Sequence, residues 1–147
     1  LRTRLGSERD AWLARHARIV GPLALGVLPP AETLGIPAGQ RGPIDDWREQ
    51  MHFAACTDDS NCIGVVRPGG AQERCRAVLA FGGERVRNGA PPQSRITPAE
   101  RADPAAYFEG RNPAALRHGI PDFEGSERFS APDRNQPATG DVIRCLS

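Results

Sequence analysis

The chain has 147 residues, which is enough for one domain with one hydrophobic core. Its 19 basic residues, all arginine, and 18 acidic residues leave a net charge of +1, which argues against nucleic acid or an anionic membrane surface as a partner. With 39% hydrophobic and 5% aromatic residues, the core should be small, and 16 Gly and 14 Pro favour long ordered loops.

The N-terminal residues 1–20 contain the longest predicted helix. Their apolar positions form a rough stripe, made by Leu5, Trp12, Leu13, Ile19 and Val20. Ser7 followed by Asp10 resembles a capping box, so the helix alternatively begins at Ser7. Residues 21–46 are rich in Gly and Pro and predict a long loop between this helix and the first strand.

Strand patterns follow over residues 47–81. Residues 47–56 alternate, with Trp47, Met51 and Phe53 on one face, and residues 62–66 and the apolar run 75–81 predict two further strands. Residues 82–140 should be a long loop, interrupted by a short helix at 103–109, and residues 141–147 a closing strand. These elements predict one α+β domain over 1–147, in which the N-terminal helix packs on an antiparallel sheet of about four strands. Trp12 and Leu13 should face alternate residues of 75–81.

The four cysteines, Cys56, Cys62, Cys75 and Cys145, form an even set without a C-x-x-C pair. In a domain with a small core this predicts two disulfides and an oxidising compartment, against free thiols or a metal site. The preferred pairing is Cys62–Cys75 with Cys56–Cys145, because the closing strand would then be tied to the sheet. The next alternative is Cys56–Cys62 with Cys75–Cys145, and one further arrangement exists.

No set of residues in the sequence predicts catalysis. There is no nucleophile elbow, no phosphate-binding glycine loop, and too few oxygen ligands at 58–61 for calcium. His52 should be a structural residue of a strand, and Glu109 a capping or solvent-facing carboxylate. We therefore expect no enzyme activity, no cofactor and no metal.

Five stretches resemble a known family when taken in order: GVLPPAETLGIP (26–37), DDWREQMHFA (45–54), CRAVLAFGG (75–83), RADPAAYFEGRN (101–112) and GDVIRCLS (140–147). They are similar to the globular part of bacterial type IV pilin-like proteins, the minor pilins and the type II secretion pseudopilins. The chain departs from the family at Arg48, where a glycine usually follows the tryptophan, and it lacks a Leu-Pro-Cys-Pro segment and the hydrophobic N-terminal helix. The residues that carry the resemblance, here called the signature residues, are Leu34, Gly35, Asp46, Trp47, Tyr107, Glu109, Gly110 and Asn112.

The resemblance implies a pilin-like fold, in which residues 1–20 are the exposed part of a long helix whose membrane part lies upstream of Leu1. It also implies a non-catalytic filament subunit, anchored in the inner membrane and then exposed to the periplasm or cell surface of a Gram-negative bacterium. Its partners would be other pilin or pseudopilin subunits. The alternative is a disulfide-stapled secreted or periplasmic binding module that binds a ligand through residues 82–140. In both cases the run DPAAYFEGRN should pack an aromatic ring under a long loop.

Overall fold

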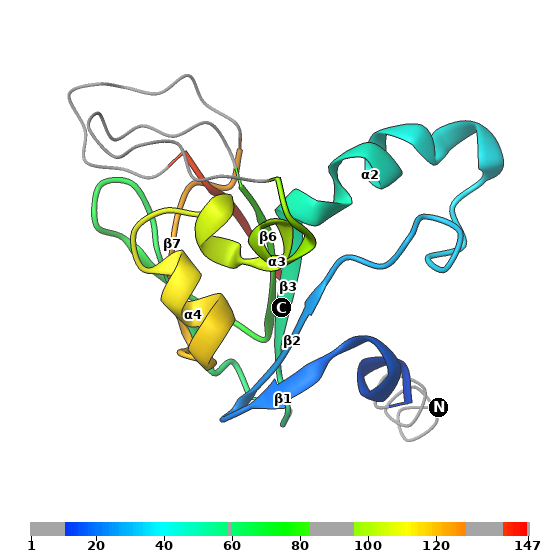
Figure 1. The fold of residues 1–147 in the computed structure, drawn as a ribbon. Coiled ribbons are helices and arrows are strands. Elements are labelled where there is room, and N and C mark those ends of the chain that lie inside the picture. Colours follow the sequence, from blue (N-terminus) through cyan, green and yellow to red (C-terminus); the bar gives the residue numbers. More distant parts are fainter. Residues whose placement is uncertain (1–10, 59, 83–95, 129–139, 147) are drawn as a thin grey trace.

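The structure, a computed structural model, describes residues 11–58, 60–82, 96–128 and 140–146. Its larger element is a five-stranded antiparallel sheet in the order β1-β2-β3-β6-β8 (Figure 1). The strands are β1 (Arg18–Val20), β2 (Leu23–Val27), β3 (Met51–Cys56), β6 (Ala77–Phe81) and β8 (Val142–Leu146). β3 lies at the centre of this sheet, between β2 and β6. Apolar residues alternate along β3 and β6.

A second sheet has three strands in the order β5-β4-β7. β4 (Ile63–Val66) pairs antiparallel with β5 (Gln72–Cys75) and parallel with β7 (Asp122–Glu124). The turn between β4 and β5 contains Gly69 and Gly70, both at positive φ, which suits glycine. The parallel pairing of β4 with β7 requires a long connection between these two strands, and residues 67–121 form it.

The helical elements that lie wholly within the described residues are short. Residues 11–16 are helical, followed along the chain by η1 (Ala38–Gln40), α2 (Gly42–Trp47), η2 (Arg48–Gln50), α3 (Pro98–Ala102), η3 (Pro104–Ala106) and α4 (Asn112–His118). α4 contacts η3 and β7. Proline occupies the first turn of α2, α3, η3 and α4, where its missing N–H is tolerated.

The hydrophobic core lies between the two sheets and α4. One face of the five-stranded sheet, the inner face, contributes Leu25, Ala54, Val78, Ala80 and Ile143. The second sheet and the helical segment contribute large side chains that are almost fully buried, among them Ile63, Val65, Phe108, Leu116 and Phe123. Several aromatic and branched side chains thus fill a core that composition alone predicted to be small.

The expected fold class is wrong. The described residues form eight strands in two sheets. Of the helix expected over 1–20, residues 1–10, including the alternative start at Ser7, lie outside the described residues, and the rest gives way to β1 at Arg18. The cause is the Gly21–Pro22 turn: Gly21 has a φ of 57°, and the chain reverses so that Ile19 pairs with Ala24 in a hairpin. β-Branched Ile19 and Val20 suit a strand better than the end of a helix.

Other expected boundaries also differ. Residues 47–50 belong to α2 and η2, so the strand begins only at Met51. The expected strand 75–81 is divided at Arg76, because β5 ends at Cys75 in the second sheet and β6 begins at Ala77 in the first. β2 lies within the segment 21–46 that was expected to be loop, and α3, α4 and β7 lie within 82–140.

Candidate functional site

Asn112, a signature residue, is fully buried at the start of α4 and holds three parts of the chain together. Its Nδ2 donates to the carbonyl oxygen of Glu124 at 2.7 Å and to Oδ2 of Asp141 at 2.8 Å. Its Oδ1 accepts from the backbone N–H of Glu124 at 2.9 Å. The amide thereby fixes β7 and the residue that precedes β8, which no aliphatic side chain of that size can do.

The neighbouring signature residues complete this arrangement. The backbone N–H of Glu109 donates to Oδ2 of Asp141 at 2.8 Å. Glu109 was expected to be a capping or a solvent-facing carboxylate, and its burial contradicts the solvent-facing alternative. Gly110 has a φ of 62°, a conformation that glycine adopts readily. We name Glu109, Asn112, Glu124 and Asp141 the polar latch, because their contacts join the helical segment to both sheets.

Tyr107 packs beneath this segment, with 3% of its surface exposed. A Cβ on Gly82 would lie 2.7 Å from the carbonyl oxygen of Tyr107, so a glycine at the end of β6 is needed for this close approach. Asp103 caps η3 by accepting from the backbone N–H of Ala105 at 2.9 Å, and Pro104 follows it. The single turn of helix and the packed aromatic ring therefore agree with what the run DPAAYFEGRN predicted, although the turn is a 3-10 helix.

The other signature residues lie apart from the latch, around α2. Leu34 is half-buried and Gly35, at a φ of 72°, ends a turn in which its N–H donates to Glu32. Asp45, beside the signature residue Asp46, accepts from the backbone N–H of Ala31 at 2.9 Å. The hydrogen bond from Ala31 to Asp45 and a second one, donated by Nε of Arg41 to the carbonyl oxygen of Ile36 at 2.8 Å, join this turn to α2.

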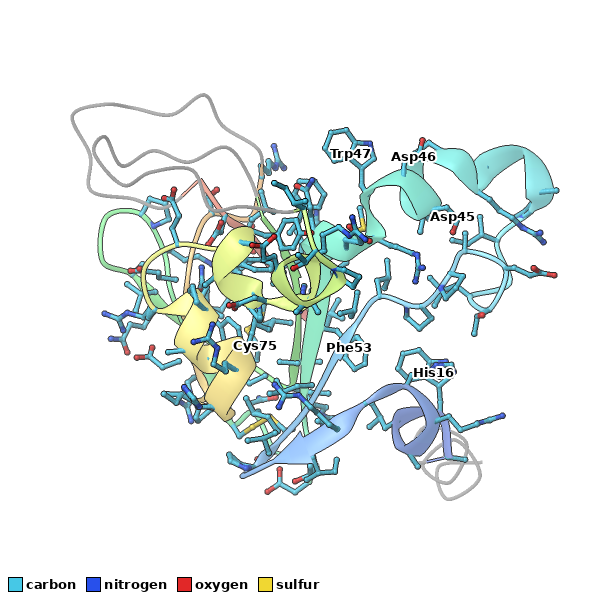
Figure 2. All side chains as sticks on the ribbon, viewed as in Figure 1. His16, Asp45, Asp46, Trp47, Phe53 and Cys75 are labelled. Atoms are coloured by element: carbon cyan, nitrogen blue, oxygen red, sulfur yellow. A yellow bond between two sulfur atoms is a disulfide. The ribbon has the colours of Figure 1, made fainter. Side chains whose placement is uncertain are left out.

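Trp47 ends α2, and its side chain projects from that end (Figure 2). It is 51% exposed, and its ring centroid lies 6.4 Å from that of Phe81. The two rings border a groove of about 680 Å³. Its apolar lining is formed by Pro43, Trp47, Met51, Leu79, Phe81 and Val142, and its charged lining by Glu127, Arg128 and Arg144. We call it the Trp47 groove.

The Trp47 groove could not be predicted directly from the sequence, because its residues come from α2, β3, β6, β8 and the segment after β7. One signal was present: Met51 and Phe53 in β3, and Leu79 and Phe81 in β6, are apolar although they alternate with the buried positions. A sheet with one solvated face normally carries polar residues at such positions. Apolar residues on both faces indicate that the second face is also covered.

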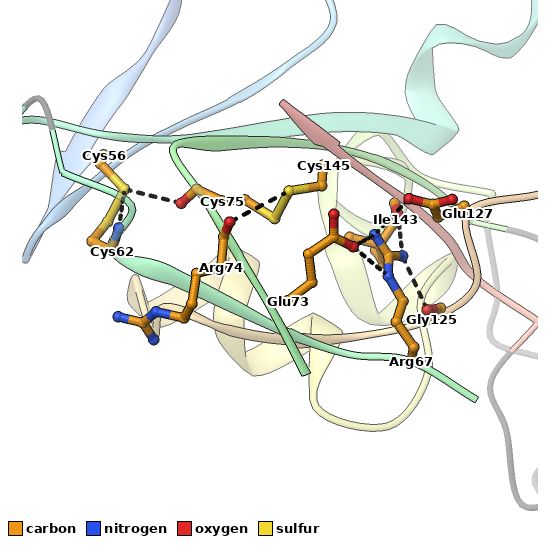
Figure 3. The surroundings of a disulfide bond; sticks show 10 residues. All are labelled: Cys56, Cys62, Arg67, Glu73, Arg74, Cys75, Gly125, Glu127, Ile143 and Cys145. Atoms are coloured by element: carbon orange, nitrogen blue, oxygen red, sulfur yellow. Dashed lines mark hydrogen bonds and ion pairs between the residues drawn. A yellow bond between two sulfur atoms is a disulfide. The ribbon is translucent and has the colours of Figure 1, made fainter. Parts of the chain in front are cut away.

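The structure contains two disulfides, Cys56–Cys62 with an S–S distance of 2.02 Å and Cys75–Cys145 with 2.04 Å (Figure 3). The preferred pairing, Cys62–Cys75 with Cys56–Cys145, is therefore wrong, and the next alternative holds. The physical reason lies in the strands: β8 pairs with β6, so Val78 opposes Cys145, and Cys75 is only three residues before Val78. Cys62 follows the turn after β3, and this turn brings its Cα to within 5.9 Å of that of Cys56.

Arg67, which lies near the Cys75–Cys145 disulfide, joins the two sheets through its side chain (Figure 3). Its guanidinium donates to the carbonyl oxygen of Ile143 at 2.6 Å and to that of Gly125 at 3.2 Å, and it pairs with Glu73 at 2.7 Å. The side chain of Arg67 is only 12% exposed. A buried guanidinium with carbonyl and carboxylate partners fulfils a structural role.

His52 has a pKa that is strongly shifted by its surroundings. Burial lowers its pKa from 6.5 to about 4, a hydrogen bond with the backbone of Glu49 opposes this shift, and the positive charge of Arg18 adds to it. The imidazole packs edge-on against Phe108, with 5.2 Å between the ring centroids. His52 is thus a neutral core residue at neutral pH, which agrees with the structural role expected for it.

The described residues contain one cluster of three potential metal ligands, formed by Glu73, Cys75 and Cys145. Cys75 and Cys145 are joined to each other, and a disulfide sulfur is not the thiolate that binds a metal. The cluster therefore offers a single carboxylate and no metal centre.

Comparisons of the chain with protein-family models, with curated proteins and with solved structures each gave no match. Within the described residues, no helix combines the length and the apolar character needed to cross a membrane.

Proposed function

We propose that this chain is a non-catalytic structural and assembly subunit of a type IV pilus or a type II secretion-like filament, a minor pilin or pseudopilin. The observation that carries the proposal is the order of the five sequence stretches that resemble this family. The proposal does not rest on the fold, since of the long helix expected over 1–20 the structure describes only residues 11–20, which are helical to His16 and then form β1.

The contacts of the signature residues support a structural role. Asn112 binds backbone groups of β7 and the side chain of Asp141, and Gly110 provides a turn at positive φ. Tyr107 is buried, so its hydroxyl is not presented to a substrate. Residues used in this way stabilise a head domain whose surface contacts other subunits.

The exposed Trp47 and the groove beside it are consistent with a subunit that assembles. A large apolar surface on a soluble domain commonly marks a contact with another protein. The two disulfides fit an oxidising compartment such as the periplasm, where pilin-like subunits act.

The second candidate is a disulfide-stapled secreted or periplasmic binding module. The same groove favours it, because about 680 Å³ with a mainly apolar lining lies within the range of small-molecule sites, roughly 300–1,000 Å³. The two candidates differ in what precedes residue 1 in the gene product. A short basic leader followed by about 20 apolar residues supports the filament subunit, whereas a cleavable secretory signal supports the binding module.

The direct test is deletion of the gene, followed by complementation with the full-length coding sequence. We expect the deletion to impair filament formation or secretion, and the complemented strain to recover it. The purified domain should show no hydrolase or transferase turnover. Intact filaments and secretion in the deletion strain, together with a reproducible catalytic turnover, would contradict the proposal.

A further inference from the structure

The five-stranded sheet has an apolar outer face, opposite the core. Antiparallel partners share a face, so the pairs Met51–Phe81 and Phe53–Leu79 place four large apolar side chains on it. Val142 opposes Phe81 and extends this face onto β8. The outer face therefore needs a covering layer, just as the inner face does.

Part of the outer face is already covered by the chain itself. Helix 11–16 lies on the β2–β3 side, where the ring centroids of Trp12 and Phe53 are 5.4 Å apart. A Cβ on Gly26 would lie 2.6 Å from the carbonyl oxygen of His16, so the helix approaches the strand where no side chain intervenes. This half of the face shows that its geometry accepts a helix.

The other half of the outer face, over β6 and β8, is the Trp47 groove. Arg128 and Arg144 lie at its rim, and both are exposed. No side chain in the described part of the chain forms an ion pair with either arginine, whereas the nearby Glu127 pairs with Arg67 at 3.6 Å. The groove thus combines an apolar floor with charged residues at its rim, two arginines and one glutamate, of which the glutamate pairs with Arg67.

The edge of β8 disfavours an added strand as the occupant. The N–H of Ile143 donates to Ser126 at 2.9 Å, and its carbonyl oxygen accepts from Arg67, so the central backbone groups of this edge are in use. Strand addition requires such groups to be free, whereas a helix in a groove binds through side chains alone.

From these observations we propose that the Trp47 groove binds an amphipathic helix whose apolar stripe is flanked by carboxylates. Its apolar side chains would lie on Trp47, Leu79 and Phe81, beside helix 11–16 on the same face, and its carboxylates would pair with Arg128 and Arg144. The chain's own residues 1–10 complement the rim poorly, because they include three arginines and two acids. That the helix comes from another filament subunit rests on the proposed function; the acidic, amphipathic character of the helix rests on the groove alone.

The test uses two synthetic helical peptides of about 18 residues, or five turns. They share one leucine stripe, which is flanked by glutamate in the first peptide and by lysine in the second. In a Trp12→Phe background Trp47 is the only tryptophan of the chain, so its fluorescence reports binding. At low ionic strength we expect the glutamate peptide to bind about tenfold more tightly than the lysine peptide, since two charge pairs change sign.

Charge reversal at the rim should reverse this preference. The double variant Arg128→Glu with Arg144→Glu should bind the lysine peptide more tightly, while the matched variant Arg74→Glu, exposed on the second sheet, should keep the original preference. Trp47→Ser, read out by anisotropy of a labelled peptide, should weaken both complexes about tenfold or more. Thermal unfolding of each variant verifies that the fold is retained.

Four results would overturn the assignment: equal affinity for both peptides, no binding of either peptide, a preference unchanged by reversal of the rim, or binding of dodecanoate without binding of the glutamate peptide. A dimer in sedimentation equilibrium that Trp47→Ser abolishes would identify a second copy of this chain as the occupant, and would also overturn it. Peptide selectivity in a protein that does not co-purify with filaments would leave the groove assignment standing and remove the proposed function.

Discussion

Asn112→Asp should destabilise the chain strongly although it changes the size of the side chain very little. The substitution removes the two hydrogen bonds that Nδ2 donates, at 2.7 Å to the carbonyl oxygen of Glu124 and at 2.8 Å to Oδ2 of Asp141. It also places an acceptor against both of these oxygens. With about 1 kcal/mol for the bond to the carbonyl, and roughly 2–3 kcal/mol for the bond to the carboxylate and its desolvation, we expect a loss of about 3–4 kcal/mol.

Urea unfolding followed by circular dichroism at pH 7 measures this loss. The matched control is Asn61→Asp, an exposed position, which should change the free energy of unfolding by less than about 0.5 kcal/mol. Protonation of either carboxyl of the variant pair restores a donor, so the difference between Asn112→Asp and the wild type should shrink as the pH falls below 5. A loss below about 1 kcal/mol at pH 7 would refute the latch.

Three further predictions concern stability, each measured by urea unfolding. Replacing both cysteines of the Cys75–Cys145 disulfide by serine, which opens a separation of 70 residues, should cost roughly 4 kcal/mol, against about 2 for Cys56–Cys62, separated by 6; equal losses would contradict this order. Burial lowers the pKa of His52 to about 4, so as the pH falls the unfolded chain takes up a proton at this residue before the folded chain does. The free energy of unfolding should therefore keep its full value above pH 6.5 and fall by roughly 3 kcal/mol towards pH 4. His52→Gln should flatten that fall, and an unchanged slope would exclude His52 as its cause. Gly119→Ala should cost well over 1 kcal/mol, because the new Cβ would lie 2.2 Å from the carbonyl oxygen of Val20, whereas Gly35→Ala, also at positive φ but in open space, should cost about 1 kcal/mol; similar losses would refute the clash.

Features that depend on residues close together in the sequence could be predicted from it. The even number of cysteines predicted two disulfides, and these are confirmed. Alternation predicted the strand that ends at Cys56, and the terminal strand was expected close to where β8 lies. Trp12 was expected on the sheet and does pack there, although it meets Phe53 of β3 rather than residues 75–81.

Features that depend on distant residues were not predicted. Apolar periodicity in residues 1–20 indicated a helix, but the turn at Gly21 allows pairing with β2, and that pairing determines the structure of residues 18–20. The disulfide pairing depends on which sheet each strand joins, and Cys75 lies at the point where the chain passes from one sheet to the other. Local propensity contains no information about the disulfide pairing, and the β-branched Ile19 and Val20 favour a strand without selecting the strand with which they pair.

The candidate sites divide in the same way. Family resemblance singled out Asn112, but its role depends on partners 12 and 29 positions away in the sequence. Trp47 was likewise singled out, while the groove beside it exists only because β6 and β8 are neighbours. The motifs therefore identified individual residues, and the topology shows what those residues do together.

The measurement that tests the filament proposal most directly is crosslinking mass spectrometry on sheared filaments from cells that produce the full-length protein. Filaments from a strain carrying Asn61→Asp serve as the matched control for a surface change that should not affect assembly. We predict that the chain is found in the filament fraction, with carboxyl-reactive crosslinks from Glu127, at the Trp47 groove, to other filament subunits. Recovery of the chain only as free protein in the soluble fraction, without crosslinks to any filament subunit, would contradict the account.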